Sequence, residues 1–377
     1  MSLRVTYHLA GTDAREAALR ARDIAHEQTV ELAPDAALPD AARRIVGRVE
    51  TVERLGDARW RAVIGFDPEL VGDDIPQLLN LLFGNISLKA GILIAGIDWP
   101  PALLSALGGP RLGIAGLRAL TGARERALLC AALKPLGASA AELAQRCYRL
   151  ALGGIDIIKD DHSLGDQRPA PFRERVELCQ EAVARANRET GGNTLYFPNV
   201  TGGAAAALER AAFAGRVGCP GVVVNALPAG LDTLRAVAAP RGRGSGRGRG
   251  GLAVISHPSL AGAFFHEDHG IAPEVLLGDL FRVAGSDGVI YPNVGGRFTF
   301  SERTCAAIND HLRRPLPAVR PAFPVPAGGI DAARVPHWLD RYGTDTIFLV
   351  GGSLYAQPDL TAAARRLAAA VGGHTHG

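Results

Sequence analysis

Ten residues near the middle of the chain decide its fold: Gly153-Gly154-Ile155-Asp156-Ile157-Ile158-Lys159-Asp160-Asp161-His162. The isoleucines predict a short strand that is buried among neighbouring strands, and the two glycines mark its start. This strand runs directly into four ionisable residues, Lys159 to His162. Because α/β enzymes keep their chemistry at the edge of the sheet where strands end, the cluster is a candidate catalytic rim. Taken alone, it also fits a solvated loop with an ion pair.

The same strand pattern recurs along the rest of the chain. Strand-like apolar runs occupy residues 127–134, 155–159, 194–200, 221–227, 252–257, 287–292, 321–327 and 345–350. Segments with helical spacing lie between or after them, at 140–152, 172–187, 204–214, 332–342 and 360–371. Eight strands with following helices over about 250 residues predict a (β/α)8 TIM barrel. An open doubly wound sheet is the alternative, but it rarely needs eight such regular units.

The first third of the chain has a mixed character. Residues 4–9 and 60–66 alternate like half-buried strands, whereas residues 13–26 and 75–82 have helical spacing. We therefore predict an N-terminal α+β domain over residues 1–125 and a barrel that forms the catalytic domain over residues 126–377.

Composition excludes several classes of protein. A formal net charge of +3 over 377 residues does not favour nucleic acid or membrane as a partner. We find neither an apolar signal core at the N-terminus nor an apolar run of about 18 residues. The five cysteines form no CxxC pair, which favours reduced thiols in a cytoplasm over a structural zinc site. We expect a cytoplasmic protein.

One segment has an unusual composition, the Arg-Gly tract at residues 241–251. In isolation such a tract suggests RNA binding through a disordered basic segment. Here it has no interleaved aromatic residues and falls between a predicted helix and the next strand. We therefore interpret it as a surface loop on the barrel face opposite the chemistry.

Polar residues and glycines follow the predicted barrel strands. They are Lys134, Lys159, Asp161, His162, Asn199, Asn225, His257, Asn293, Gly328, Gly329, Gly351 and Gly352. Lysine, aspartate and histidine together could hold a hard divalent cation, although a free ammonium group cannot be a ligand. The two Gly-Gly turns after the last two strands expose backbone N–H groups before expected helix N-termini, which predicts a phosphate site.

These residues resemble a known family. The segments that carry the resemblance are 133–137 (LKPLG), 153–162, 327–329 (AGG) and 351–352 (GG). They are similar to ribulose-bisphosphate carboxylase (RuBisCO), and more closely to its non-carboxylating relatives, the RuBisCO-like or form IV proteins. The resemblance covers nearly the whole chain and reaches residues 27–29 and 82–85 of the first domain.

The resemblance implies a role for each residue of the central cluster. Lys159 would react with CO2 to give a carbamate, which is an anionic oxygen ligand for Mg²⁺. Asp161 would be a second ligand of this cation. Lys134 would be the acid/base or enolate-stabilising lysine, with its basicity lowered by the cation and by burial. An ion pair at the end of a strand is the alternative role for Lys134.

Two histidines complete the candidate catalytic and metal-binding residues. His162 stands where the family has a second metal-binding glutamate, so it is either a ligand of the cation or an acid/base group. His257 is followed by proline where the family has the arginine that grips a second phosphate. His257 is retained as a candidate catalytic residue.

Other departures from the family also affect the second phosphate. Residues 287–292 replace a segment that carries a phosphate-binding histidine, and Ala327 stands where a serine contacts the same phosphate. We therefore predict a sugar monophosphate, with its phosphate held by Gly328, Gly329, Gly351 and Gly352. The loop at 293–298 lacks the lysine that the carboxylase presents to CO2, and Arg297 is a candidate phosphate contact. Carboxylation of ribulose bisphosphate is not expected.

Three functions remain open. The first is Mg²⁺-dependent enolisation or isomerisation of a sugar monophosphate, as in methylthio-sugar phosphate metabolism. The second is decarboxylation, or transcarboxylation with hydrolysis, of a branched keto-acid sugar phosphate, as in apiose breakdown. The third is a non-catalytic binding or regulatory protein. The family also implies a homodimer or larger assembly in which Glu27, Thr29 and Asn85 of one subunit complete the site of its partner.

Overall fold

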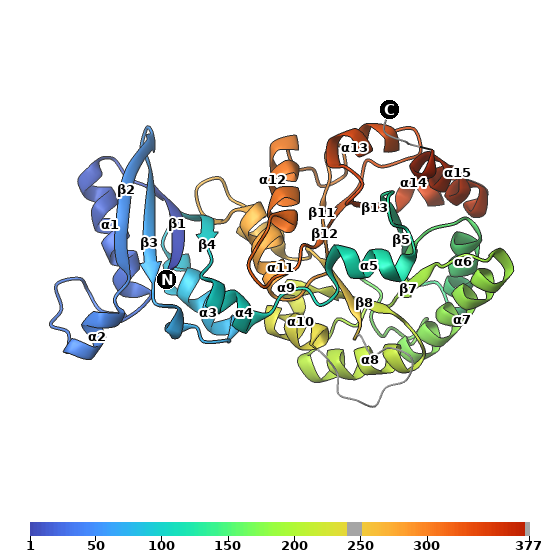
Figure 1. The fold of residues 1–377 in the computed structure, drawn as a ribbon, viewed down its shortest axis with the longest axis horizontal. Helices are drawn as coiled ribbons and strands as arrows, with labels where there is room; N and C mark the ends of the chain where they lie inside the picture. The colour runs from blue at the N-terminus through green and yellow to red at the C-terminus, as the bar shows by residue number, and fades with distance from the viewer. Residues whose placement is uncertain (240–250, 374–377) are drawn as a thin grey trace. The chain divides into compact units, whose positions relative to one another are not determined.

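The computed structural model describes residues 1–239 and 251–373, so the Arg-Gly tract lies outside the described residues except for Gly251. The chain divides into two compact units, and Figure 1 shows the elements of both. The first unit comprises residues 1–108, 260–280 and 316–319, and the second comprises 109–259, 281–315 and 320–377. The split at 125/126 remains a prediction about independently folding domains.

The first unit is an α+β unit built on one five-stranded sheet. Its strands are β1 (Leu3–Ala10), β2 (Arg48–Gly56), β3 (Arg59–Phe66), β4 (Ile92–Asp98) and the short β10 (Gly270–Ile271), in the order β10-β4-β1-β3-β2. Pairing is antiparallel except between β10 and β4. Every second residue of β1 is buried, as the alternation in the sequence predicts for a strand with one covered face.

Two of the helices of the first unit, α1 and α3, begin at side-chain caps. They are α1 (Ala14–Glu27), α2 (Asp40–Ile45), α3 (Ile75–Phe83) and α4 (Pro101–Leu107), with short 3₁₀ turns at Pro68–Leu70, Asn85–Leu88 and Ala261–Phe264 and a π-helix at Glu274–Leu280. Asp13 accepts a hydrogen bond from Glu16 N–H and caps α1, and Asp74 accepts one from Gln77 N–H and caps α3.

The second unit is the predicted eight-stranded parallel barrel. Its strands are β5 (Leu128–Leu133), β6 (Ile157–Asp160), β7 (Leu195–Phe197), β8 (Gly221–Asn225), β9 (Ala253–His257), β11 (Gly288–Pro292), β12 (Phe323–Ala327) and β13 (Ile347–Val350). Each strand pairs in parallel with its neighbours in the order β7-β6-β5-β13-β12-β11-β9-β8. A parallel bridge between Asn199 and Val223 joins β7 to β8 and closes the ring.

Helices surround this barrel (Figure 1). They are α6 (Ala140–Leu152), α7 (Phe172–Thr190), α8 (Ala204–Arg216), α9 (Ala226–Ala229), α10 (Leu231–Ala238), α11 (Phe281–Val283), α12 (Glu302–Arg313), α13 (Val335–Tyr342), α14 (Gly352–Tyr355) and α15 (Leu360–Gly372). The helix after β5 starts at a capping box in which Ser139 and Glu142 satisfy each other's backbone N–H groups. Side-chain caps also start α12, at Ser301, and α15, at Asp359.

An additional helix, α5 (Gly113–Thr121), closes the N-terminal end of the barrel. Its Ile114 and Leu117 belong to the buried cluster formed by the inward side chains of the strands. Asp287, just before β11, accepts hydrogen bonds from the N–H groups of Leu112 (2.7 Å) and Gly113 (2.6 Å). The start of α5 is therefore tied to the barrel wall, and the opposite end of the barrel is left for chemistry.

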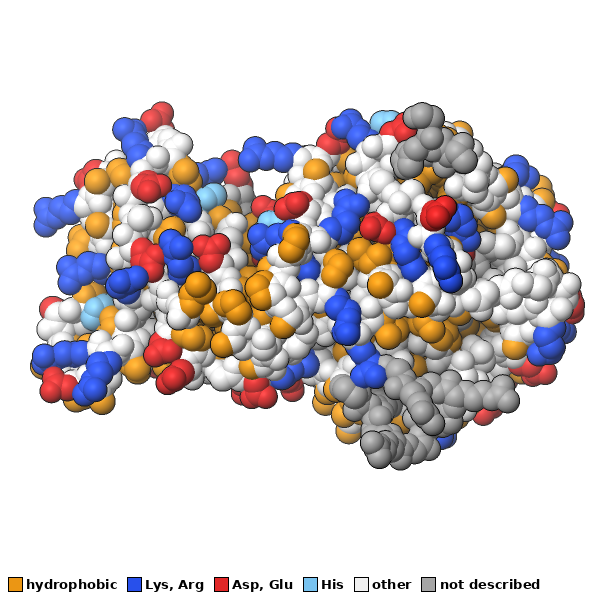
Figure 2. Space-filling view, in the orientation of Figure 1, with side chains coloured by type: hydrophobic (Ala, Val, Ile, Leu, Met, Phe, Trp, Pro, Cys, Tyr) orange, Lys and Arg blue, Asp and Glu red, His pale blue; other side chains and the backbone are white. Residues whose placement is uncertain are grey.

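The surface charges and the cysteines agree with what the composition indicates. On the face in Figure 2, Lys and Arg side chains are interspersed with Asp and Glu over both units. All five cysteines are buried and free. No helix among the described residues is long and apolar enough to cross a membrane.

Candidate active site

The candidate site is the polar layer that covers the apolar interior of the barrel. Five residues of that interior share the inward face of their strands: Ala132, Ile157, Phe197, Val223 and Ile255. Two residues further along the same strands, the side chains return to this face. Those positions hold Lys134, Lys159, Asn199, Asn225 and His257. The strand-end residues selected from the sequence therefore share one layer.

Lys159 is buried at the centre of this cluster, with only 1% of its surface exposed. Its Nζ donates a hydrogen bond to the carbonyl oxygen of Asp160 at 2.7 Å. Burial lowers the pKa of the Lys159 amine, because removal from water disfavours its charged form. The nearby Asp161 opposes this shift but does not cancel it. Lys159 therefore has more of the unprotonated, nucleophilic amine than an exposed lysine.

Asp161 binds the side chains of both Lys134 and His162. Its Oδ2 accepts a hydrogen bond from Lys134 Nζ, and its Oδ1 accepts one from the His162 N–H at 2.7 Å and lies 2.7 Å from His162 Nδ1. Burial alone would raise the pKa of Asp161, but the hydrogen bond from His162 and the charges of Lys159 and Lys134 outweigh it. The pKa of this carboxyl therefore lies well below its usual range, and the group stays anionic.

His162 and His257 stack face to face. Their ring centroids are 4.2 Å apart with 3° between the ring planes. The backbone N–H of Ser259 donates to His257 Nδ1 at 3.2 Å, which leaves the proton of the neutral ring on Nε2. Burial, with further contributions from Lys159 and His162, lowers the pKa of His257 to about 2. His257 is therefore a neutral hydrogen-bond donor and a poor base at neutral pH.

The loop that carries Asp161 and His162 is held by two asparagine side chains. Asn199 Nδ2 donates to the carbonyl oxygens of His162 and Leu164, both at 2.9 Å. Asn225 Nδ2 donates to the same His162 oxygen at 3.0 Å. The sequence placed these asparagines at the rim but did not reveal this role, because the bonds run from β7 and β8 to a loop that follows β6.

Asp160 was not selected from the sequence, and the structure gives it a supporting role. It lies on the outward face of β6 and is completely buried. Its carboxylate accepts hydrogen bonds from Arg175 Nε (3.1 Å), Tyr196 Oη (2.7 Å) and Asn199 N (3.0 Å). The alternation of β6 could have shown that Asp160 points away from Lys159. Its partner Arg175 could not have been found that way, since it comes from α7.

The backbone of Lys134 is fixed on both sides. Its N–H donates to Tyr355 Oη at 3.3 Å, and its carbonyl oxygen accepts a hydrogen bond from Arg146. Its side chain is 42% exposed, and a β-carbon built at Gly351 would lie 3.6 Å from its Cε. Lys134 is thus brought to both Asp161 and the turn after β13.

The two glycine turns differ from each other. Gly328 and Gly329 have φ of +97° and +65°, and a β-carbon at Gly329 would lie 2.8 Å from the carbonyl oxygen of Val294. Glycine is required there by the backbone and by the loop after β11, whatever the turn binds. By contrast, Gly352 faces open space and begins α14. A helix follows each turn, but α13 begins only at Val335, so no helix starts directly at Gly329.

The remaining predicted residues lie elsewhere. In the first unit, Asn85 Nδ2 donates to Glu27 Oε1 at 2.9 Å, whereas Thr29 Oγ1 donates to the carbonyl oxygen of Ala25 at 2.7 Å. In the second unit, the guanidinium of Arg297 lies 5.5 Å from the ring of its neighbour Phe298. Glu27 and Asn85 therefore form a pair, and neither Thr29 nor Arg297 joins the buried cluster described above.

The cluster fits a divalent cation on the condition that Lys159 carries a carbamate. Among the described residues, no three His, Cys, Asp or Glu side chains are placed to hold a metal ion. Asp161 supplies one anionic oxygen ligand, and Lys159 supplies another only as a carbamate. Asn225 Oδ1 adds a buried acceptor with no hydrogen-bond partner. These oxygen donors suit a hard ion such as Mg²⁺.

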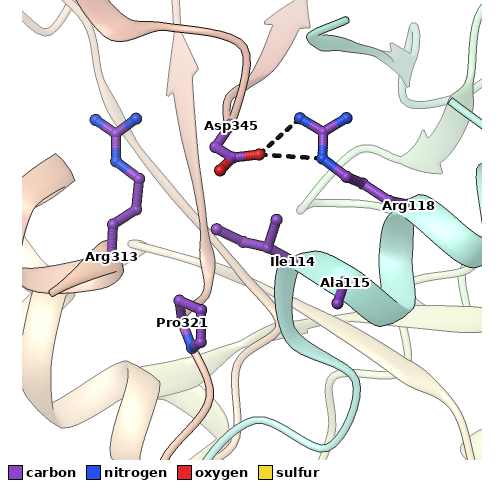
Figure 3. A pocket seen from close by; sticks show the side chains of 6 residues that line it. All are labelled: Ile114, Ala115, Arg118, Arg313, Pro321 and Asp345. Atoms are coloured by element: carbon purple, nitrogen blue, oxygen red, sulfur yellow. Dashed lines mark hydrogen bonds and ion pairs between the residues drawn. The ribbon is translucent and has the colours of Figure 1, made fainter. Parts of the chain in front are cut away.

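A pocket also lies at the other end of the barrel. It has a volume of 380 Å³ and is lined by Ile114, Ala115, Arg118, Arg313, Pro321 and Asp345 (Figure 3). Arg118 holds Asp345 through Nε (3.0 Å) and Nη2 (2.7 Å) and donates its remaining N–H groups to backbone carbonyl oxygens. Its donors are therefore all used within the protein.

Comparison with known proteins agrees with this geometry. The family model of the ribulose bisphosphate carboxylase large chain, catalytic domain, matches residues 113–372. A ribulose bisphosphate carboxylase-like protein 1 of Rhodopseudomonas palustris is 42% identical over 98% of this chain and 97% of its own length. The 5-methylthioribulose-1-phosphate isomerase of Rhodospirillum rubrum is 40% identical, with 98% and 96% covered. A 2,3-diketo-5-methylthiopentyl-1-phosphate enolase of Bacillus licheniformis is 31% identical, with 87% and 80% covered.

Solved structures show the same architecture. The crystal structure of a Rubisco-like protein from Rhodopseudomonas palustris matches with a TM-score of 0.88 and 39% identity, covering 100% of this chain and 99% of that one. An octameric Rubisco from Pyrococcus horikoshii matches with a TM-score of 0.88 and 27% identity, with 99% and 88% covered. Enzymes of this family generally use Mg²⁺ with a carbamylated lysine.

Proposed function

The chain belongs to the ribulose bisphosphate carboxylase large-chain family, as one of its non-carboxylating RuBisCO-like members, and on that premise we propose that it isomerises a sugar monophosphate by moving a proton next to a carbonyl group. A methylthio-sugar phosphate is the preferred substrate, since similar proteins are named for an isomerase and an enolase of such compounds.

One observation carries this proposal: a buried lysine with a lowered pKa beside a carboxylate that stays ionised. The neutral amine of Lys159 can form an N–C bond to CO2 and lose one proton to solvent, which leaves an anionic carbamate. Lys159 and Asp161 would then hold Mg²⁺. When bound, Mg²⁺ supplies a Lewis acid that polarises the substrate carbonyl and stabilises the enolate oxygen.

Lys134 is the group that we assign to proton transfer. In the structure it is paired with Asp161, and it also lies beside Gly351 in the last barrel turn. Asp161 would be one of the residues that hold the cation, and Lys134 would then be free to face the substrate. Lys134 removes the proton from the carbon next to the carbonyl and returns it to the adjacent carbon. The Nε2–H group of the neutral His257 donates a hydrogen bond to a substrate oxygen.

The phosphate would be held by backbone N–H groups of the two glycine turns. The opening at Gly352 and the approach of Lys134 to Gly351 support an anion at this side of the barrel mouth. Asn293, which follows β11, is already used: its Oδ1 accepts a hydrogen bond from Tyr342 Oη at 2.7 Å, and its Nδ2 donates to the carbonyl oxygen of Gly328 at 3.3 Å. One phosphate therefore fits better than two.

The test is conversion of 5-methylthioribulose 1-phosphate with Mg²⁺ and bicarbonate, followed by ³¹P NMR. We expect a new sugar phosphate to appear without loss of carbon, and no fixation of labelled CO2 onto ribulose 1,5-bisphosphate. Release of CO2 from a branched keto-acid sugar phosphate, with no isomerisation of any monophosphate, would favour a decarboxylase instead.

We extend the proposal to a homodimer or larger assembly in which Glu27, Thr29 and Asn85 of one subunit complete the site of another. The Glu27–Asn85 pair is exposed, so it can contact a ligand or a partner. Mixing an inactive Glu27→Ala protein with an inactive Lys159→Met protein should restore activity through hybrid sites. If the mixture stays inactive while subunits exchange, these residues act within their own chain or not at all.

A further inference from the structure

The side chain of Asn225 leaves one buried oxygen atom without a hydrogen bond. It ends β8 on the inward face, and only 9% of its surface is exposed. Its backbone N–H donates to Thr201 Oγ1 at 2.8 Å, and its Nδ2 donates to the carbonyl oxygen of His162 at 3.0 Å. Its Oδ1 is buried and has no partner. A buried acceptor without a donor is costly, so each one calls for an explanation, and a bound ion is one such explanation.

The orientation of this amide is fixed by chemistry. Turning it over would place Oδ1 against the carbonyl oxygen of His162, which would put two acceptors together and lose a hydrogen bond. Asn199 offers a matched contrast, because its Nδ2 donates to the same His162 oxygen. Its Oδ1, however, accepts from Thr201 N (3.1 Å) and Thr201 Oγ1 (2.6 Å). Of the two asparagines on this carbonyl, only Asn225 keeps a free oxygen.

The surroundings of Asn225 indicate what binds there. It is one hydrogen bond from the residue that follows Asp161, and it shares the polar inward layer with Lys159. His162 is a poorer donor to a hard cation, since imidazole nitrogen suits softer metals. Its Nδ1 is also engaged by Asp161, and its ring lies flat on His257. The oxygen donors in this layer are then Asp161, the Lys159 carbamate and Asn225.

We propose that Asn225 Oδ1 is a neutral oxygen ligand of the divalent cation, and that His162 positions Asp161 instead of binding the metal. This inference rests on the proposed function, because the cation is the one that the proposed reaction uses. The three oxygen donors would be Asp161, the Lys159 carbamate and Asn225. Together they would give a hard site of modest negative charge, with the remaining positions left for substrate and water.

The test measures Mn²⁺ binding to the full-length protein by EPR, with bicarbonate present. Asn225→Ala should weaken Mn²⁺ binding by about tenfold or more, a loss typical of a damaged metal site. Asn225→Asp should retain or tighten binding, although an aspartate cannot donate to His162. Asn199→Ala, which removes the other amide from the same carbonyl, should weaken it far less. If Asn225 only held the loop, Asn225→Asp would lose as much affinity as Asn225→Ala.

A second measurement needs no variant. Pulsed EPR of Mn²⁺ bound to the unaltered protein should show no strong ¹⁴N coupling from a coordinated imidazole. Such a coupling, or unchanged Mn²⁺ affinity in Asn225→Ala, would overturn the inference and leave the proposed reaction standing. If the unaltered protein with bicarbonate fails to bind Mn²⁺ at all, both the inference and the metal-dependent proposal are wrong.

Discussion

The two ends of the barrel use polar residues in opposite ways. At the N-terminal end, two buried carboxylates are fully engaged: Asp287 with the N–H groups of Leu112, Gly113 and Val254, and Asp156 with Arg126 and the N–H of Leu129. At the C-terminal end, Asn225 Oδ1 has no partner and Lys134 is 42% exposed. Groups whose hydrogen bonds are all made within the protein stabilise the fold. Groups that can still form a hydrogen bond remain available to a ligand. The difference places the chemistry at the C-terminal end, as in other barrels of this kind.

The largest expected effect is on activity at the C-terminal end. Lys159→Met keeps the length of the side chain but removes the amine that forms the carbamate. We expect turnover to fall by about a thousandfold or more, the scale seen when a group acting as part of a catalytic unit is removed. The melting temperature is measured alongside, because Lys159 also supplies positive charge beside Asp161 and the variant must be shown to be folded. Retained turnover with Mg²⁺ and bicarbonate would remove the carbamate from the mechanism.

At the N-terminal end, removal of a buried polar side chain should lower stability and leave activity unchanged. Asp287→Ala leaves the N–H groups of Leu112, Gly113 and Val254 without their acceptor. Each such buried group costs about 1–3 kcal/mol, so the free energy of unfolding should fall by about 3 kcal/mol or more in a urea titration. Turnover of the folded fraction should stay near that of the unaltered protein. A large loss of turnover with unchanged stability would contradict the division between the two ends.

The two glycine turns separate stability from substrate binding at the C-terminal end of the barrel. Gly329→Ala places a β-carbon 2.8 Å from Val294 O at positive φ, so we expect a stability loss of about 1–2 kcal/mol. Gly352→Ala meets no protein atom within 4 Å and should change stability by less than about 0.5 kcal/mol. If phosphate binds at this turn, KM should rise for Gly352→Ala. An unchanged KM there would exclude Gly352 from the phosphate site.

The pH dependence of activation gives the smallest effect. Because burial lowers the pKa of Lys159, the neutral amine appears at lower pH than in an ordinary lysine. Carbamate formation should therefore rise with pH and reach half its maximum below the usual lysine value of about 10.4. The signal of ¹³C-labelled bicarbonate bound to the protein can be followed by NMR, with Lys159→Met as the blank. A midpoint at or above the usual value would contradict the assigned environment.

Much of the catalytic end could be predicted from the sequence. Strand positions followed from apolar periodicity, and alternation along each strand then placed Lys134, Lys159 and His257 on one face. The N-terminal end could not be predicted in this way. Asp287 had been considered only as part of a segment lacking a phosphate contact, and the structure turns its carboxylate toward α5. That contact joins residues 174 positions apart, which no local pattern encodes.

The glycine turns show a similar limit. From the sequence, phosphate binding was the reason to expect glycine at these turns. The structure shows a second reason at Gly328 and Gly329: residues 294–296 approach them closely, and this contact depends on how two loops pack. In the same way, residues 260–280 fall in the first unit, where β10 extends its sheet, although they lie between barrel strands in the sequence. Chain order predicts such a segment poorly, because long-range pairing decides where it goes.

The most direct test of the account follows solvent deuterium into the substrate. The protein is incubated in D2O with Mg²⁺, bicarbonate and 5-methylthioribulose 1-phosphate, and the carbons next to the carbonyl are examined by NMR. The account predicts deuterium at those carbons, its absence in Lys159→Met, and its persistence in any Asp287→Ala protein that remains folded. No deuterium in the unaltered protein, under conditions where the sugar phosphate binds and stabilises it, would contradict the central claim.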